Sequence, residues 1–233
     1  MSDAEAQPAA VLFDVDGTLY RQGPVRRRMA LRIVVAHLAS PRSGIEVARC
    51  LAAYRRAQEE LRGASPMRDL GEEQVRRAAK RCGAPPERVR AIVERWMERE
   101  PLPLVAAYAR AGLRELLDAL DAAGAQAGVV SDYPAEAKLR ALRVHGRFRA
   151  VVTAQDAGVG AFKPNPAGIL QALQCLGVTS ERAVYVGDRE DVDGRAAAAA
   201  GARFVMVGSR EQAGAMQRGA KDLHEVRTLL LGV

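Results

Sequence analysis

Side chains suited to chemistry follow short apolar runs at three separate places in this sequence of 233 residues. They are Asp14 and Asp16 after the first run, Ser131 after the second and Asp188 after the third. A short apolar run without polar alternation is typical of a buried strand in a parallel sheet. The carboxyl ends of parallel strands meet at one edge, where open α/β folds hold their ligands, so we expect these side chains to converge on one site.

The acidic members of this set suit a divalent cation. Asp14 and Asp16 are two positions apart on an extended chain, so their carboxylates point to the same side and repel each other. A cation would relieve this repulsion, and Asp188 supplies a third carboxylate for it. Oxygen ligation by few protein groups favours Mg²⁺, which keeps waters and accepts a phosphate oxygen. The alternative is that Asp14 and Asp16 are only turn residues around Gly17.

Two further residues suit an anionic group. The hydroxyl of Ser131 can donate a hydrogen bond to a phosphate oxygen, and Lys163 is a compact cation that suits a phosphate or a crowded carboxylate. Lys163 stands out because this chain has 35 basic residues and otherwise prefers arginine. The alternative is an ordinary solvated lysine in a loop.

Four short motifs together resemble those of the haloacid dehalogenase (HAD) superfamily of phosphohydrolases, in its phosphoglycolate phosphatase-like form with a helical cap. The first is DVDGTL at 14–19, the second contains Ser131, the third is KPNP at 163–166 and the fourth is GDREDVD at 187–193. Their order and spacing agree with the family over essentially the whole chain. Two details depart from the commonest pattern: Asp132 stands where asparagine is frequent, and the fourth motif offers Asp191 as well as Asp193.

The resemblance implies a Mg²⁺-dependent phosphatase that works through an aspartyl-phosphate intermediate. Asp14 would be the nucleophile. Asp16 would be the general acid and then the general base, which requires surroundings that raise its pKa relative to that of Asp14. The phosphoryl group would be bound by Ser131, Lys163, Gly17 and Thr18. The metal would be bound by Asp14, Asp188 and the main-chain carbonyl of Asp16, with Asp193 supporting these ligands.

Positioning these residues requires strands that alternate with helices. Apolar runs near residues 9–14, 127–130, 150–153, 183–186 and 204–207 are interpreted as strands. Helical stretches are expected near 110–123, 135–144, 166–176, 192–200 and 222–231. This alternation predicts the α/β class: a Rossmann-like parallel sheet flanked by helices.

The block between the first two strands has a different pattern. Four amphipathic helical stretches are expected near 24–39, 44–62, 70–82 and 86–99, with no strand among them. We therefore expect a Rossmann-like HAD core of residues 1–20 and 105–233, with an inserted all-helical cap domain of residues 21–104. Pro101 and Pro103 are interpreted as the return linker.

Composition limits the partners and the compartment. An apolar fraction of 48% argues against a disordered chain, and no apolar run approaches the ~20 residues of a membrane-spanning helix. The first residues lack the pattern of a secretory signal, and three cysteines without a CxxC pair suit reduced thiols, so a cytoplasmic protein without membrane contact is expected. A compositional bias towards alanine and arginine explains much of the net charge of +7. The basic residues lack interleaved aromatic side chains that could stack on bases, so nucleic acid is not an expected partner.

Several alternatives remain at this stage. A dehalogenase of the same superfamily would not need Asp16, and a phosphonate-cleaving relative would need a cap lysine, for which Lys80 is the one candidate in the cap block. A sugar phosphomutase shares every core motif. A non-catalytic module that binds a phospho-ligand or RNA would not need the full set of acids. The expected substrate is a small phosphorylated metabolite, and no pattern indicates the oligomeric state.

Overall fold

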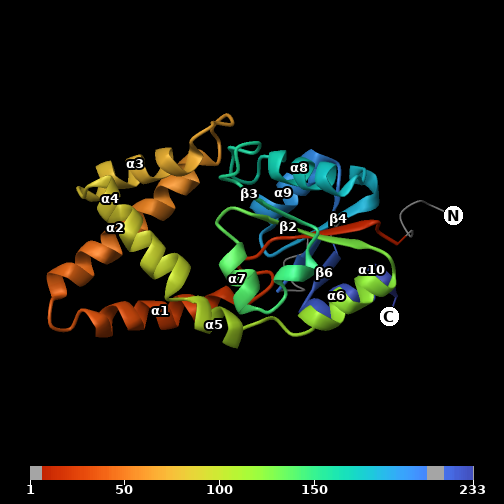
Figure 1. Ribbon diagram of the computed structural model, residues 1–233, viewed down its shortest axis with the longest axis horizontal. Helices are drawn as coiled ribbons and strands as arrows, with labels where there is room; N and C mark the ends of the chain where they lie inside the picture. The colour runs from red at the N-terminus through yellow and green to blue at the C-terminus, as the bar shows by residue number, and fades with distance from the viewer. Residues whose placement is uncertain (1–6, 209–217, 233) are drawn as a thin grey trace.

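The computed structural model describes residues 7–208 and 218–232. Within these residues, six parallel strands form one sheet in the order β3-β2-β1-β4-β5-β6, and helices cover both of its faces (Figure 1). The strands are β1 (Ala10–Phe13), β2 (Gln126–Ser131), β3 (Ala150–Thr153), β4 (Ala183–Gly187), β5 (Arg203–Val207) and β6 (Arg218–Ala220). This sheet, with helices on both faces, confirms the predicted Rossmann-like α/β class.

Strand β1 lies in the interior of the sheet, between β2 and β4, and all of its side chains are buried. Val11 and Phe13 pack on one face with α6 (Leu113–Ala122) and α10 (Leu223–Leu231). Leu12 packs on the other face with α8 (Ala167–Leu176) and α9 (Arg195–Ala200). Burial on both faces explains the continuous apolar run in the sequence.

A helical insertion occupies residues 22–99, between β1 and β2. It consists of α1 (Gln22–Ala36), α2 (Pro41–Leu61), α3 (Leu70–Cys82), α4 (Pro86–Val93) and the π-helix η2 (Glu94–Arg99), and all of these residues are among those described. The four predicted helical stretches are therefore present, the last of them changing from α to π geometry after Val93. Free thiols of Cys50 and Cys82 meet where α2 packs on α3, with the two sulfurs 3.1 Å apart.

The predicted return linker is partly wrong, because α5 (Leu102–Ala107) forms there and packs against α7 (Glu136–Ala141). Proline fits the first turn of a helix, where its missing N–H has no partner to lose, so Pro103 does not prevent α5. Strand β6 was also not predicted, since three residues at the sheet edge carry little periodic signal.

Short segments complete the described chain. They are the 3₁₀ turns η3 (His145–Arg147) and η4 (Ser180–Arg182), and the π-helix η5 (Glu190–Gly194), which leads into α9. In the part of the chain that the structure describes, we find no helix with both the length and the apolar character needed to cross a bilayer. Residues 1–6, part of the stretch interpreted above as lacking a secretory signal, lie outside the described residues.

Candidate active site

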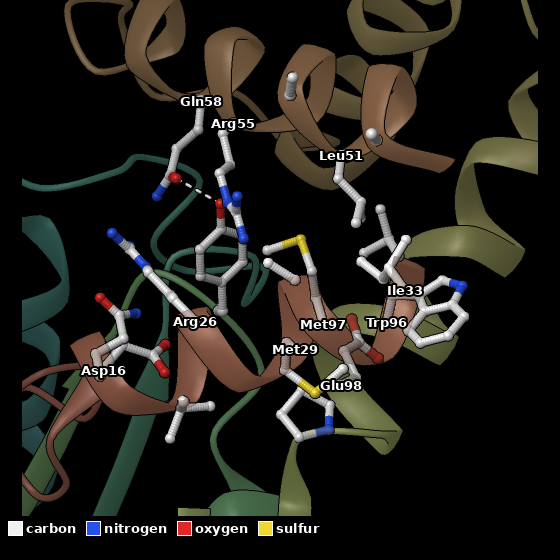
Figure 2. A pocket seen from close by; sticks show the side chains of 18 of the residues that line it. Asp16, Arg26, Met29, Ile33, Leu51, Arg55, Gln58, Trp96, Met97 and Glu98 are labelled. Atoms are coloured by element: carbon white, nitrogen blue, oxygen red, sulfur yellow. Dashed lines mark hydrogen bonds between the residues drawn. The ribbon is translucent and has the colours of Figure 1, made fainter. Parts of the chain in front are cut away.

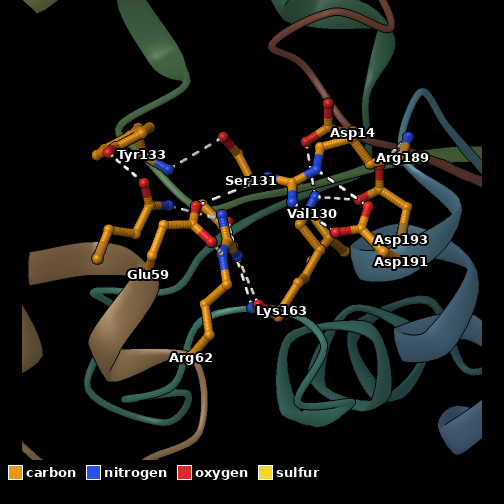
Figure 3. Close-up of polar contacts among 12 residues, drawn as sticks. Asp14, Glu59, Arg62, Val130, Ser131, Tyr133, Lys163, Arg189, Asp191 and Asp193 are labelled. Atoms are coloured by element: carbon orange, nitrogen blue, oxygen red, sulfur yellow. Dashed lines mark hydrogen bonds and ion pairs between the residues drawn. The ribbon is translucent and has the colours of Figure 1, made fainter. Parts of the chain in front are cut away.

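Asp14 is the first residue after β1 and lies at the carboxyl edge of the sheet. Its backbone N–H donates to the carbonyl of Val186 on β4 at 2.9 Å, which fixes its place at the carboxyl edge of the sheet. The ammonium of Lys163 donates to Asp14 Oδ1 at 2.7 Å and to Asp193 Oδ1 at 2.6 Å (Figure 3). Tyr185 accepts a third hydrogen bond from the same ammonium at 3.0 Å. The lysine thus links groups that follow different strands.

The structure also brings three carboxylates close enough together to share one cation. One oxygen from each of Asp14, Asp188 and Asp193 lies within 4.8 Å of the other two. Gly17 has φ +110°, and a Cβ atom on it would lie only 1.9 Å from Asp188 Oδ2, so glycine leaves the space that this carboxylate occupies. An oxygen-only donor set of carboxylates fits a hard divalent cation.

Burial is the largest influence on the pKa values of the acids in this cluster. Burial raises the pKa of Asp14 well above its usual range, and the carboxylates of Asp193 and Asp188 add to the effect while Lys163 opposes it. Burial and Asp193 likewise raise the pKa of Asp188 to about 6. For Lys163, burial lowers the pKa, but Asp14 and Asp193 outweigh that effect and raise it. A divalent cation would favour the ionised acids.

Asp16 has surroundings of the opposite kind. The ammonium of Lys138 donates to both of its carboxylate oxygens, at 2.7 and 2.6 Å, and the hydroxyl of Tyr20 donates to Asp16 as well. Burial raises the pKa of Asp16, but the charge and hydrogen bonds of Lys138 and the hydroxyl of Tyr20 together lower it. The expectation that the pKa of Asp16 is raised relative to that of Asp14 is therefore wrong for the free protein.

Lys138 is the site residue that the sequence analysis missed. It lies on α7 and is buried, and its side chain reaches across to Asp16, which is 122 positions earlier. The signal was present: Lys138 is one of four lysines in an arginine-rich chain, the same property that singled out Lys163. Its distance from any motif hid it.

The remaining residues assigned to phosphate binding lie around the same edge. Ser131 ends β2, is almost fully buried and accepts a hydrogen bond from the backbone N–H of Tyr133 at 3.2 Å. The buried Thr18 donates to Asp14 Oδ2 at 3.2 Å, so its hydroxyl contacts the carboxylate assigned as nucleophile. Arg110 donates to the carbonyls of Gly17 and Thr18, which holds the turn after β1.

Asp132, whose role the sequence left open, connects the helical insertion to the sheet. Its Oδ2 accepts from Arg62 at 2.7 Å and from Gln58 at 3.1 Å, both at the end of α2, and its Oδ1 accepts from the backbone N–H of Lys163 at 3.1 Å. Asp191 instead pairs with Arg189 at 2.7 Å (Figure 3), and it is not part of the three-carboxylate cluster.

A cavity of about 1020 Å³ lies between the sheet edge and the helical insertion. Asp14, Asp16, Lys163 and Asp188 line its inner end, and residues of α1, α2 and η2 line the rest (Figure 2). A phosphate ester whose phosphorus faces Asp14 would have its alcohol in this cavity.

Comparison with known proteins identifies the family. The haloacid dehalogenase-like hydrolase family model matches residues 8–201. The glyceraldehyde 3-phosphate phosphatase of Methanopyrus kandleri is 35% identical over 215 residues, which covers 85% of this chain and 83% of that protein. The chain therefore belongs to the haloacid dehalogenase-like hydrolase family, and the resemblance carried by the four motifs is confirmed.

Solved structures share this fold across different activities. A HAD phosphatase from Thermococcus onnurineus matches with a TM-score of 0.65 at 23% identity, covering 96% of this chain and 98% of that one. A β-phosphoglucomutase from Clostridium difficile matches with a TM-score of 0.62 at 17% identity, covering 94% and 93%. Because a phosphatase and a mutase share the fold, the activity has to be argued from the site.

Proposed function

We propose that this protein is a Mg²⁺-dependent phosphatase that hydrolyses a phosphate monoester through an aspartyl-phosphate. The observation that carries the proposal is the position of Asp14, whose carboxylate lies both against Lys163 and within the cluster formed with Asp188 and Asp193. One arrangement thus offers a nucleophilic oxygen, a cation for the phosphoryl group and ligands for a metal.

In the first step, Asp14 attacks phosphorus and the bond to the alcohol oxygen breaks. Asp14 and Asp188, with the main-chain carbonyl of Asp16, would hold Mg²⁺, which neutralises negative charge between the carboxylate and the phosphate when it is bound. Asp193 accepts from the backbone N–H groups of Asp188 and Arg189, at 3.2 and 3.1 Å, and so orients the loop that carries Asp188. Ser131, Lys163 and the turn at Gly17 and Thr18 would bind the phosphoryl oxygens.

Asp16 would give its proton to the leaving alkoxide and then take one from the water that hydrolyses the aspartyl-phosphate. This requires a proton on Asp16 while substrate is bound, although Lys138 favours its ionised form in the free protein. A phosphate dianion beside Asp16 acts in the opposite direction and raises the pKa of this carboxyl. Substrate binding would therefore favour the protonated form of Asp16 that the reaction needs.

We further propose the division expected from sequence: a core of residues 1–20 and 105–233 and a cap of residues 21–104. The cap would exclude water from the aspartyl-phosphate and surround the alcohol. The cavity between α2 and the sheet edge and the contacts of Arg62 with Asp132 support this role. A phosphorylated metabolite as substrate is inferred from the phosphatase relative, and a cytoplasmic location stays a prediction from the sequence.

Release of phosphate from p-nitrophenyl phosphate tests the proposal directly. We expect turnover with Mg²⁺, loss of turnover with EDTA, and a loss of at least about a thousandfold in Asp14→Asn, because an amide cannot replace the nucleophile. Asp118→Asn, at an exposed position of α6, is the control and should keep full activity. Substantial activity in Asp14→Asn would refute the assignment. Phosphate release without any added bisphosphate would favour a phosphatase over the mutase alternative.

A further inference from the structure

The cavity beside the site extends far beyond the space that a phosphate occupies. It runs from Asp14 and Lys163 at the sheet edge to Leu38 and Pro41, at the junction of α1 and α2. Its volume of about 1020 Å³ is at the upper end of the range of roughly 300–1,000 Å³ that holds drug-sized ligands. A three-carbon alcohol would fill only a small part of it.

The part of the cavity away from the sheet is lined mainly by apolar side chains. Val25, Met29 and Ile33 recur every four positions on α1, so one stripe of that helix faces the cavity. Leu51 on α2 faces this stripe from the other side, and Trp96 on η2 lies beside Ile33 (Figure 2). Met97 adds a flexible thioether to the same wall, and Met adapts to irregular apolar ligands.

Polar groups lie mostly at the phosphate end of the cavity. Arg26, Arg55 and Gln58 are grouped near Asp16, whereas Ile33, Leu51 and Trp96 lie apart from them (Figure 2). At the far end, His37 is held by its contact with the Ile33 carbonyl at 2.8 Å. Glu98 borders the apolar wall, and burial raises the pKa of its carboxyl.

This distribution disfavours a sugar phosphate with many hydroxyl groups. Most of its hydroxyl groups would lie against Met29, Ile33 and Trp96, where they would lose water without gaining partners. A hydrocarbon body loses nothing of this kind and gains from leaving water. The open end of the cavity, its mouth, is also apolar. Val34, Leu38 and Ile45 line the cavity and are 59%, 69% and 60% exposed, so a hydrocarbon body could continue along them.

We propose that the substrate is the phosphate monoester of an extended apolar alcohol, with the phosphate at Asp14 and the hydrocarbon body along α1. The proposal rests on the phosphatase function proposed above and specifies its substrate class. The side chains of Arg26, Arg55 and Lys138 near Asp16 complement the phosphate charge, and the apolar wall complements the alcohol.

A series of n-alkyl phosphates from ethyl to octyl, below their micellar concentrations, measures this preference. We expect kcat/KM to rise by up to about fourfold for each added methylene, as burial of a methylene group predicts. Glyceraldehyde 3-phosphate serves as the polar comparison and should fall below the hexyl and octyl esters. A flat or falling series, or a preference for glyceraldehyde 3-phosphate, would overturn the proposal while Asp14-dependent hydrolysis of p-nitrophenyl phosphate leaves the phosphatase function intact. Failure to hydrolyse any ester would instead refute the function itself.

Two neighbouring residues of α1 provide a matched pair of variants. Val34 and Val35 are 59% and 57% exposed, but only Val34 lines this cavity. Val34→Asp should lower kcat/KM for octyl phosphate by about tenfold or more and leave ethyl phosphate within about twofold, because a charge at the mouth opposes the apolar tail. Val35→Asp should leave both esters within about twofold.

Equal effects of the two variants on octyl phosphate would contradict the proposed path of the hydrocarbon. The mouth residues Val34, Leu38 and Ile45 have a second conceivable occupant, another copy of this chain. A dimer in sedimentation that Val34→Asp dissociates, together with no dependence on chain length, would assign these side chains to an interface and overturn the proposal.

Discussion

Asp14 and Asp16 are two residues apart, yet their surroundings shift the pKa values of the two carboxyl groups in opposite directions. Burial among other carboxylates raises the pKa of Asp14, whereas Lys138 and Tyr20 outweigh burial and lower that of Asp16. For the proposed reaction both tendencies have to reverse, so that Asp14 is ionised and Asp16 is protonated. A metal beside Asp14 and a phosphate beside Asp16 each act in the required direction. The site would thus become competent only when both are bound.

Replacing Lys138 tests this view of Asp16. In Lys138→Met the pKa of Asp16 should rise, because its ionised form loses the buried ammonium that stabilises it. The alkaline limb of the pH profile of kcat, where Asp16 loses its proton in the substrate complex, should therefore move to higher pH. Lys80→Met, at an exposed position of α3, is the matched control and should reproduce the parent profile. An unchanged limb in Lys138→Met would contradict a link between this lysine and the acid.

The raised pKa of Asp188 would make metal binding by this carboxylate dependent on pH. Its pKa in the folded chain is about 6, against the usual 3.8, so the folded state holds a proton that the unfolded state has already released between these values. Protonation of Asp188 in the folded state therefore contributes to the free energy of unfolding at low pH, and this contribution is lost as pH rises through about 6. Mg²⁺ competes with the same proton, so the increase in Tm caused by Mg²⁺ should be small near about pH 5 and larger near about pH 7.5.

Two variants separate this effect from general electrostatics. Asp188→Asn should abolish the Mg²⁺-induced increase in Tm at both pH values. Asp191→Asn, three positions later and paired with Arg189, should preserve the increase and its dependence on pH. A full response in Asp188→Asn would remove this carboxylate from the metal site.

The end of α2 connects the helical insertion to the catalytic edge. Arg62 donates to Asp132 Oδ2 and, at 2.5 Å, to the carbonyl of Lys163, so one guanidinium contacts both the loop after β2 and the loop that carries Lys163. Both side chains of the Arg62–Asp132 pair are about nine-tenths buried, which shields the pair from water. Asp132 thus has a structural role that its place in the sequence did not reveal: it binds the end of α2 next to the site.

Removing this connection should weaken both stability and turnover. We expect Arg62→Ala to lower the free energy of unfolding by about 2 kcal/mol, since a mostly buried acceptor loses a charged donor. Its kcat should fall several-fold because the insertion is less firmly placed over the site. Arg56→Ala on the same helix, where the arginine is 70% exposed and pairs only loosely with Glu60, should change stability by less than about 0.5 kcal/mol. Equal effects in urea titrations of the two variants would contradict the role of Arg62.

Elements with a local signal could be predicted from the sequence, and contacts between distant elements could not. The apolar run at 150–153 coincides with β3, and the periodicity at 70–82 coincides with α3, because burial on a sheet and on a helix face leaves a direct pattern. The short α5 was missed because its prolines resemble a linker. Lys138 and Arg62 carry no local signal at all, since their importance lies in partners 122 and 70 positions away.

At the scale of the whole molecule, one apolar core continues from the sheet into the insertion. The same cluster of buried side chains contains Phe13 of β1 and Val47 of α2, together with Met29 of α1 and Leu104 of α5. Continuity of this kind couples the stability of the two parts, because neither can lose its packing without exposing the other.

This coupling predicts a single cooperative unfolding transition. Trp96 is the only tryptophan in the sequence and lies in the insertion, so its fluorescence reports that part alone. Far-UV circular dichroism reports all helices and strands. We expect the two signals to give the same midpoint in urea. An earlier transition in fluorescence would show that the insertion unfolds by itself.

The wall of the cavity and the groups that would act on phosphate come from different parts of the chain. Val34, Leu38 and Ile45 are exposed and contribute little to the core, whereas Asp14 and Lys163 are anchored at the buried sheet edge. Substitutions at these three exposed positions, which would contact the far end of the proposed substrate, should therefore cost little stability. A directed-evolution library confined to those three positions should yield variants with altered alcohol preference and unimpaired expression, which makes this molecule highly evolvable.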